Sequence, residues 1–155
     1  LTNFGWDVCG VDPSEEGIKQ AQTHFPELNL NLGSAYEDLS KKYGQFPAVI
    51  SLEVVEHVYS PRDYVRCIMN LLEPGGTGII STPYHGYLKN LALALTGKMD
   101  NHFTALWDHG HIKFWSKKTM KSLLSESGFE LINFYGAGRV PPLSKSMVVV
   151  FRKPI

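Results

Sequence analysis

The chain has few of the features that mark an oxidising compartment or a membrane. Of its 155 residues only two are cysteines, Cys9 and Cys67. Cys9 lies in a strand-like apolar pattern and Cys67 in a helical one, so we expect buried reduced thiols without a disulfide framework. No apolar run reaches the roughly 18 residues of a transmembrane segment, and no basic-then-apolar leader opens the chain. A soluble, cytoplasmic protein is the expectation.

An excess of charge of one sign is also missing. The 15 lysine and arginine residues balance 15 aspartate and glutamate residues, so the formal net charge is zero. Nucleic-acid binding normally requires a clustered basic face, and the sequence has no long run of either sign. We therefore expect no nucleic-acid partner. A chain of this length forms one domain, which buries roughly two thirds of its unfolded surface.

Strand and helix patterns alternate along most of the chain. Apolar or alternating segments predict strands at residues 6–11, 28–32, 48–52, 77–81, 129–135 and 146–152. Helical spacing and capping residues predict helices at residues 14–24, 36–43, 60–72, 87–96 and 116–127. This order predicts an α/β fold: a mostly parallel sheet, covered by helices on both faces and closed by an antiparallel strand pair. Residues 74–76 are expected to form a turn, and residues 97–101 to be mobile.

The most informative segment runs from residue 47 to residue 83, where two apolar strands, both expected to be buried, flank a helix. Ligands bind such βαβ units at the carboxyl ends of the strands. Here the first strand is followed by Glu53, Glu56 and His57. Glu53 could face a cofactor, Glu56 and His57 could act as acid and base, or all three could hold a divalent cation. Alternatively, Glu56 and His57 only cap and solvate the following turn.

Two further features leave alternatives open. Asp12 ends the first strand, where a carboxylate can accept both hydroxyls of a ribose, or can cap the helix that follows. Residues 88–95 form an apolar pattern that suits either a lid over an apolar substrate or a helix packed on the core. An interfacial membrane helix is less favoured, because the polar face offers only Lys89 and Asn90. A peripheral membrane contact stays open.

Histidines gather in the irregular part of the chain, together with two tryptophans. The residues concerned are His102, Trp107, Asp108, His109, His111 and Trp115. The spacing of His109 and His111 is wrong for a helical zinc pair, and no thiol lies nearby, so structural zinc is not expected. The pair could abstract a proton or bind substrate from a loop over the ligand edge, or could be surface histidines without a role.

Four motifs together resemble the class I S-adenosylmethionine-dependent methyltransferases. They are VCGVDPS at residues 8–14, GSA at residues 33–35, EVVEHV at residues 53–58 and LEPGG at residues 72–76. Their order and spacing cover the whole chain. The Glu-x-x-Glu-His motif and the His-x-x-x-x-Phe pattern from His109 to Phe114 are similar to those of the ubiquinone-biosynthesis O-methyltransferases, the 3-demethylubiquinone 3-O-methyltransferase-like group.

This resemblance implies a role for each residue of a cofactor site. Asp12 would hold the ribose of S-adenosylmethionine, Ser34 and Ala35 would lie beside the adenine, and Glu53 would border the methionine part. Ser34 stands where many relatives carry an aspartate, which removes a charged contact to the adenine amine.

The resemblance also implies a reaction. Glu53, Glu56 and His57 would be ligands of a divalent cation such as Mg²⁺, and His109 would be a residue on the substrate side. Glu56, His57 and His109 are thus the candidate catalytic residues. The cation would lower the pKa of a catechol-like phenol, a small-molecule acceptor, and the phenolate would attack the sulfonium methyl group.

The family's glycine-rich loop, which follows its first strand, is not found in this chain. Residues 1–5 resemble the end of the helix that follows that loop. We therefore expect one methyltransferase domain over residues 1–155, truncated at its amino terminus, with residues 84–115 as a lid or substrate-side insertion. The missing strand normally lies in the middle of the sheet, so two strands would have unpaired edges.

Three other functions compete with this interpretation. Asp12 would serve a nicotinamide ribose equally well in an NAD-dependent oxidoreductase fragment, although the Glu-Pro-Gly-Gly turn and the closing strand pair favour a methyltransferase. A non-catalytic methyltransferase-like module is a second alternative, which the intact Asp12, Glu53, Glu56 and His57 argue against. Methyl transfer to a sugar, an amine or another small acceptor is the third.

Overall fold

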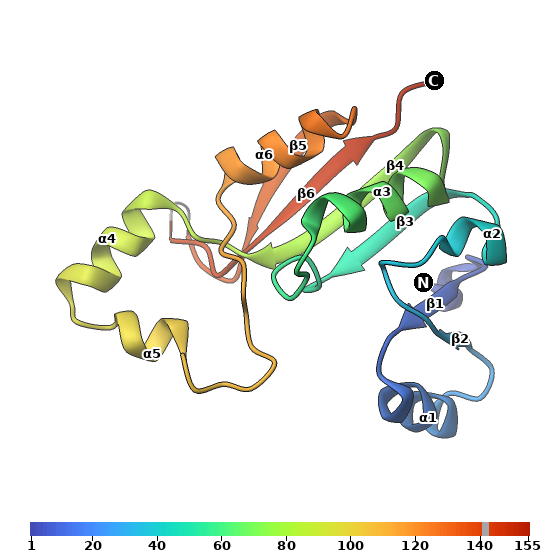
Figure 1. Ribbon diagram of the computed structural model, residues 1–155, viewed down its shortest axis with the longest axis horizontal. Coiled ribbons are helices and arrows are strands. Elements are labelled where there is room, and N and C mark those ends of the chain that lie inside the picture. Colours follow the sequence, from blue (N-terminus) through green and yellow to red (C-terminus); the bar gives the residue numbers. More distant parts are fainter. Residues whose placement is uncertain (141–142) are drawn as a thin grey trace.

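The structure, a computed structural model, describes residues 1–140 and 143–155. Over these residues the strands form two sheets (Figure 1). The smaller sheet pairs β1 with β2 in parallel, and the larger has the order β3-β4-β6-β5. The strands are β1 (Cys9–Asp12), β2 (Asn29–Leu32), β3 (Phe46–Leu52), β4 (Leu72–Pro83), β5 (Glu130–Ala137) and β6 (Ser146–Arg152).

Helices follow the strands in the order that the sequence predicts. They are the short 3-10 helix η1 (Thr2–Phe4) and the α-helices α1 (Glu15–His24), α2 (Leu39–Tyr43), α3 (Pro61–Leu71), α4 (Tyr87–Leu95), α5 (Met99–Phe103) and α6 (Lys117–Glu126). Side-chain hydrogen bonds explain where two of these helices begin. The Ser14 hydroxyl accepts the Gly17 N–H at 3.0 Å, and Ser116 forms a capping box with Thr119. Such caps satisfy N–H groups that have no partner inside the helix.

The larger sheet carries the main core. β3 and β4 run in parallel, whereas β6 is antiparallel to both β4 and β5. The α/β fold and the closing antiparallel pair are thus confirmed. Helices α3 and α6 lie side by side over this sheet (Figure 1). Fully or almost fully buried side chains between them include Tyr64, Val65, Leu72, Ile80, Met120, Leu124, Met147, Val149 and Phe151.

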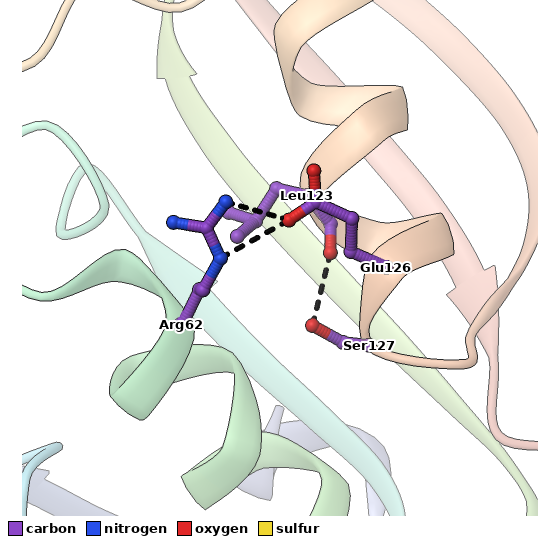
Figure 2. Close-up of polar contacts among 4 residues, drawn as sticks. All are labelled: Arg62, Leu123, Glu126 and Ser127. Atoms are coloured by element: carbon purple, nitrogen blue, oxygen red, sulfur yellow. Dashed lines mark hydrogen bonds and ion pairs between the residues drawn. The ribbon is translucent and has the colours of Figure 1, made fainter.

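An ion pair joins the two helices at the surface of this core. The Arg62 guanidinium of α3 donates to one carboxylate oxygen of Glu126, through Nε at 3.1 Å and Nη2 at 2.7 Å (Figure 2). One turn away in the same view, the Ser127 hydroxyl donates to the carbonyl of Leu123 at 2.9 Å and closes the end of α6. The ion pair links α6 to α3, whereas the Ser127 contact lies within the end of α6 itself.

The expectation of buried strands covered on both faces is wrong for β3. Its side chains Ile50 and Leu52 are 43% and 64% exposed. Within the described residues β3 pairs with β4 alone, and β1 pairs with β2 alone. Alternate side chains of a strand point to opposite faces. Because α3 covers only one face of β3, the apolar residues of the other face remain open to solvent.

Three local predictions also differ from the structure. Residues 73–76 lie inside β4, as a bulge: Phe46 pairs with Leu72 but Ala48 pairs with Thr77. Residues 99–103 form the helix α5 instead of a mobile loop. The two cysteines are free thiols as expected, although Cys9 is only half-buried.

Helix α4 does not pack its apolar residues on the core. The exposed side chains along it are Tyr87, Leu88, Leu91 and Leu95, whereas Lys89 is its buried residue. Figure 1 shows α4 and α5 projecting together beyond the end of the larger sheet. Across the described ranges, every helix is too short or too polar to cross a bilayer.

Candidate functional site

The first part of the site lies where β1 and β2 end. Asp12 pairs with Leu32, and the N–H of Gly33 donates to the Asp12 carbonyl at 3.1 Å. This register brings Ser34 next to Asp12 at the carboxyl edge of the small sheet. The Asp12 carboxylate is exposed and accepts the Ser14 N–H at 2.8 Å. The cap of α1 is Ser14, so the capping interpretation of Asp12 is wrong; the Asp12 carboxylate binds the backbone of the cap residue and remains open to solvent.

Two neighbouring residues shape the chain after β2. The Ser34 hydroxyl accepts the N–H of Tyr36 at 3.2 Å, which tightens the turn that follows. Ala35 is partly buried and packs against the main core. The loop at residues 33–35 is therefore anchored to the core at its far end.

Glu53 begins the turn after β3 in a strained conformation. Its φ of 53° lies in the left-handed region, which non-glycine residues seldom adopt. Three contacts with Ser81 of β4 hold it there. The Glu53 N–H donates to the carbonyl and to the hydroxyl oxygen of Ser81, each at 3.1 Å, and the Ser81 hydroxyl donates to the Glu53 carboxylate at 2.8 Å. The carboxylate is thus directed to the end of β4.

Glu56 is the buried acid of the site. Only 1% of it is exposed, and neither carboxylate oxygen has a hydrogen-bond partner among the described residues. Burial raises the pKa of the Glu56 carboxyl, because a charged form is poorly solvated there. A buried carboxylate without partners is costly unless a ligand, a proton or a cation satisfies it.

The contacts of the His57 ring define which of its two nitrogens carries the proton. Its Nδ1 lies 3.1 Å from the carbonyl oxygen of His109 and 3.3 Å from that of Gly110. Carbonyl oxygens only accept, so Nδ1 carries the proton. In the neutral ring Nε2 then holds a lone pair, which can accept a proton or bind a metal.

His111 completes a group of three side chains. One ligand atom from each of Glu56, His57 and His111 lies within 4.8 Å of the other two. The His57 and His111 rings meet edge to face with centroids 4.9 Å apart, and Trp107 packs on His111 at 5.1 Å. Burial, and next the nearby His57, lower the pKa of His111, which favours its neutral, ligating form.

Backbone contacts fix this group in place. The N–H groups of Ile112 and Lys113 both donate to the carbonyl of Glu56, at 2.9 and 3.0 Å. The buried indole N–H of Trp115 donates to the Val55 carbonyl at 3.1 Å. The loop that carries His111 is therefore bound to the turn that carries Glu56 and His57.

The structure brings together part of the residue set that the sequence indicates. Glu56 and His57 meet as expected, but His111 joins them, whereas the Glu53 carboxylate contacts Ser81. His109 contributes its backbone carbonyl, and its side chain is exposed. The sequence places His109 and His111 on one loop but cannot show which ring points inward. His109 itself has a φ of 60°, in the left-handed region.

Comparisons with known proteins agree with this arrangement of strands. A family profile described as a methyltransferase domain matches residues 1–133. The chain therefore belongs to the methyltransferase domain family, and it resembles the class I S-adenosylmethionine-dependent members.

Several similar curated proteins carry the name "Ubiquinone biosynthesis O-methyltransferase". The protein of Caulobacter sp. (strain K31) is 41% identical over 101 residues, which cover 63% of this chain and 40% of the relative. The protein of Roseobacter denitrificans is 31% identical over 143 residues, which cover 88% and 56%. The human mitochondrial protein is 28% identical over 143 residues, covering 88% and 39%. The chain thus spans about half the length of these relatives, or less.

Solved structures share the fold at low sequence identity. An S-adenosylmethionine-dependent methyltransferase of Methanosarcina mazei superposes with a TM-score of 0.73 at 18% identity, over 100% of this chain and 85% of that one. The magnesium protoporphyrin IX methyltransferase of Synechocystis, solved with bound S-adenosylhomocysteine, gives 0.68 at 17% identity, over 94% and 64%. These likenesses establish the Rossmann-like fold.

Proposed function

We propose that this chain forms the cofactor and acceptor site of an S-adenosylmethionine-dependent O-methyltransferase that acts on a phenol or catechol-like small molecule. The observation that carries the proposal is the group formed by Glu56, His57 and His111 at the end of β3. The names of the curated relatives support O-methylation, and a ubiquinone precursor is the acceptor that those names favour.

In this proposal the strand ends bind the methyl donor. Asp12 holds the ribose, because its carboxylate is exposed at the edge of the small sheet. Ser34 and Ala35 lie beside the adenine, and Glu53 borders the methionine part. Support for this placement of the methyl donor comes from the register of β1 and β2, which aligns Asp12 with the loop that carries Ser34.

The group at Glu56 then prepares the acceptor. His57 Nε2, unprotonated in the neutral ring, or the Glu56 carboxylate takes the proton of the acceptor hydroxyl. The acceptor oxygen forms a bond to the methyl carbon as the carbon–sulfur bond breaks, and the sulfur keeps that electron pair. Positioning supplies much of the rate of such a transfer. The backbone hydrogen bonds that hold Glu56 and His57 in place therefore matter as much as the basicity of these residues.

The same group fits a divalent cation, although Mg²⁺ is not the best match. Glu56 has two buried oxygens without partners, and His57 and His111 add two imidazoles. Mg²⁺ prefers an all-oxygen shell. One carboxylate and two imidazoles suit Zn²⁺ or a related transition metal. We therefore propose Glu56, His57 and His111 as ligands; a bound cation would lower the pKa of the acceptor hydroxyl.

We also propose that the catalytic domain needs a strand between β1 and β3. The support is that each of these strands has a single partner within the described part of the chain, β2 and β4 respectively. Residues 84–115 would be the substrate-side insertion of this domain, because they carry His111 and the projecting α4 and α5.

The proposal is tested by methyl transfer and by binding. S-adenosylhomocysteine is titrated calorimetrically into this chain and into a form extended at its amino terminus, and transfer of labelled methyl to catechol is then measured. We expect the extended form to bind and to methylate, and Glu56→Gln and His57→Asn each to lower the rate by about 10²-fold or more. Glu73→Gln makes the same change of charge as Glu56→Gln but at an exposed residue, and it is the control. Undiminished transfer in both site variants would refute the assignment.

A further inference from the structure

The two sides of the proposed site lie on different parts of the chain. Residues 1–36 carry Asp12 and Ser34, on the side proposed for the methyl donor. Residues 45–155 carry the group at Glu56, on the side proposed for the acceptor. Within the described ranges β1 and β2 pair only with each other, so no strand pairing joins the two parts. Methyl transfer nevertheless requires that both sides keep a fixed relative position.

The side chain of Tyr36 joins these two parts. Its phenol oxygen accepts the backbone N–H of Tyr59 at 2.6 Å and that of Ser60 at 3.3 Å. Among the described residues no other hydrogen bond and no ion pair connects residues 1–36 with residues 45–155. The phenol is therefore the polar link between the donor side and the acceptor side.

The backbone of Tyr36 is held on the donor side. Its N–H donates to the Ser34 hydroxyl at 3.2 Å, and the N–H of Glu37 donates to the Ser34 carbonyl at 3.0 Å. Tyr36 thus lies in a closed turn that begins at Ser34. The position of its hydroxyl follows the position of the loop that is proposed to lie beside the adenine.

The two N–H groups bound by Tyr36 lie just after the residues that prepare the acceptor. Tyr59 follows His57 by two residues, and Val58 between them is buried. Ser60 precedes α3, and its side chain forms no cap hydrogen bond. Neither N–H has a second acceptor within the described part of the chain. The phenol oxygen therefore fixes a backbone segment whose N–H groups would otherwise have to bind water.

Tyr59 also contacts the loop that carries His111. The Lys113 ammonium lies over the Tyr59 ring, 5.7 Å from its centroid. The backbone N–H of Lys113 donates to the Glu56 carbonyl at 3.0 Å. A displacement of the Tyr59 backbone would therefore disturb the turn at Glu56 and, through Lys113, the loop beside it.

Packing does not explain the placement of Tyr36. The residue is 51% exposed and lies outside the main core. Removal of its hydroxyl would therefore act chiefly through the two hydrogen bonds to the segment after His57.

We propose that Tyr36 is a positioning residue for methyl transfer, whose phenol oxygen fixes the loop at residues 33–36 relative to the turn at residues 53–60. The role rests on the proposed function. Without this oxygen, donor and acceptor would each still bind on their own part of the chain, but they would meet in the reactive geometry less often. A misplacement of about 1 Å can cost about 10²-fold in rate.

Steady-state kinetics of the amino-terminally extended form with catechol test this role. Tyr36→Phe keeps the ring and removes the accepting oxygen. We expect kcat to fall about tenfold, while the KM values for S-adenosylmethionine and catechol each change by less than about twofold. Tyr135→Phe removes the same hydroxyl from a tyrosine that is 54% exposed on β5, at the edge of the larger sheet opposite to β3, and should leave kcat unchanged.

Amide hydrogen exchange of the same extended form gives a readout that does not depend on turnover. S-adenosylhomocysteine should order the loop at residues 33–36 and thereby hold the phenol against its two donors. In the wild type we expect the N–H groups of Tyr59 and Ser60 to exchange at least about tenfold more slowly with this ligand bound. Tyr36→Phe should bind the ligand with unchanged affinity but lose this protection.

Three results would overturn the proposal: a kcat of Tyr36→Phe within about twofold of the wild type, an effect on KM alone, or protection of the Tyr59 amide that survives in the variant. Urea denaturation checks that the variant is folded, and Tyr36→His, whose ring is too short to reach either N–H, replaces it if it is not.

Failure of this role and failure of the proposed function give different results. Protection that depends on Tyr36, without methylation of catechol, would support the link and refute the phenol acceptor. Full activity of Tyr36→Phe would refute the link and leave the proposed function standing. A wild type that binds no S-adenosylhomocysteine would overturn both.

Discussion

The Nδ1 atom of His57 lies 3.1 Å from the backbone carbonyl oxygen of His109. This contact fixes the proton on Nδ1 and leaves Nε2, in the neutral ring, as the nitrogen that can accept a proton or bind a metal. The same contact shows that His109 and His111, which the sequence does not distinguish, have different roles. His109 acts through its backbone, whereas His111 contributes its ring.

A pair of histidine substitutions tests this division of roles. His109→Asn keeps the carbonyl and tolerates a positive φ, so we expect an almost unchanged affinity for Zn²⁺. His111→Asn removes a ligand and should weaken binding by at least tenfold, because even indirect partners of metal ligands are worth about 10- to 100-fold. Competition with a chromophoric chelator measures both affinities. Equal losses in the two variants would show that the assignment of His111 is wrong.

The indole of Trp115 should stabilise the turn at Glu56. Trp115→Phe keeps an aromatic ring in the core but leaves the buried Val55 carbonyl without its donor. We expect a loss of about 1–3 kcal/mol in the free energy of unfolding, measured by urea denaturation. Trp107→Phe, at a residue that is 54% exposed, is the matched control and should cost less than about 0.5 kcal/mol. Equal costs would mean that the hydrogen bond is not what Trp115 contributes.

Features that depend on neighbouring residues could be predicted well from the sequence. Ser14 and Ser116 cap the helices that they precede, and the last strand covers residues 146–152 as expected. A cap needs only the next three residues, and an alternating strand carries its own pattern. The same holds for Glu56 and His57, which are placed by the turn directly after β3.

Features that depend on distant contacts could not be predicted in this way. Helix α5 is short and polar, and its packing comes from His102 and Phe103 against His85 and Phe114. The exposure of Ile50 depends on which strands lie beside β3, information that its own pattern lacks. The His111 ring joins the site on a loop that Ile112 and Lys113 bind to the Glu56 carbonyl, a contact between distant residues that spacing alone does not predict.

The ion pair between Arg62 and Glu126 should contribute little to stability. Both side chains are largely exposed, at 70% and 52%. A double-mutant cycle with Arg62→Gln and Glu126→Gln should give a coupling of about 0.2–1 kcal/mol, smaller in 1 M salt because exposed charges are screened. Leu124→Ala, in the core of the same helix, should cost about 2–5 kcal/mol by comparison. A coupling that is large and independent of salt would contradict this view.

The burial of His85 should make the protein less stable in mild acid. Its pKa in the folded protein is lowered to about 4 from 6.5, first by burial and then by Lys89. Above pH 6.5 the ring is neutral in both states. Between about pH 6.5 and 4 the unfolded chain binds a proton that the folded chain does not, so the free energy of unfolding falls as the pH falls.

The full shift would correspond to about 3 kcal/mol, and relaxation of the site should reduce the effect to about 1–2 kcal/mol. Urea denaturation at pH 7.5 and pH 5 measures it, with His85→Phe as the comparison, because phenylalanine keeps the ring contacts with Phe103 and Phe114 but cannot titrate. The variant should lose less stability between the two pH values than the wild type does. If both lose the same amount, the acid sensitivity arises elsewhere, and His85 is not held neutral by its surroundings.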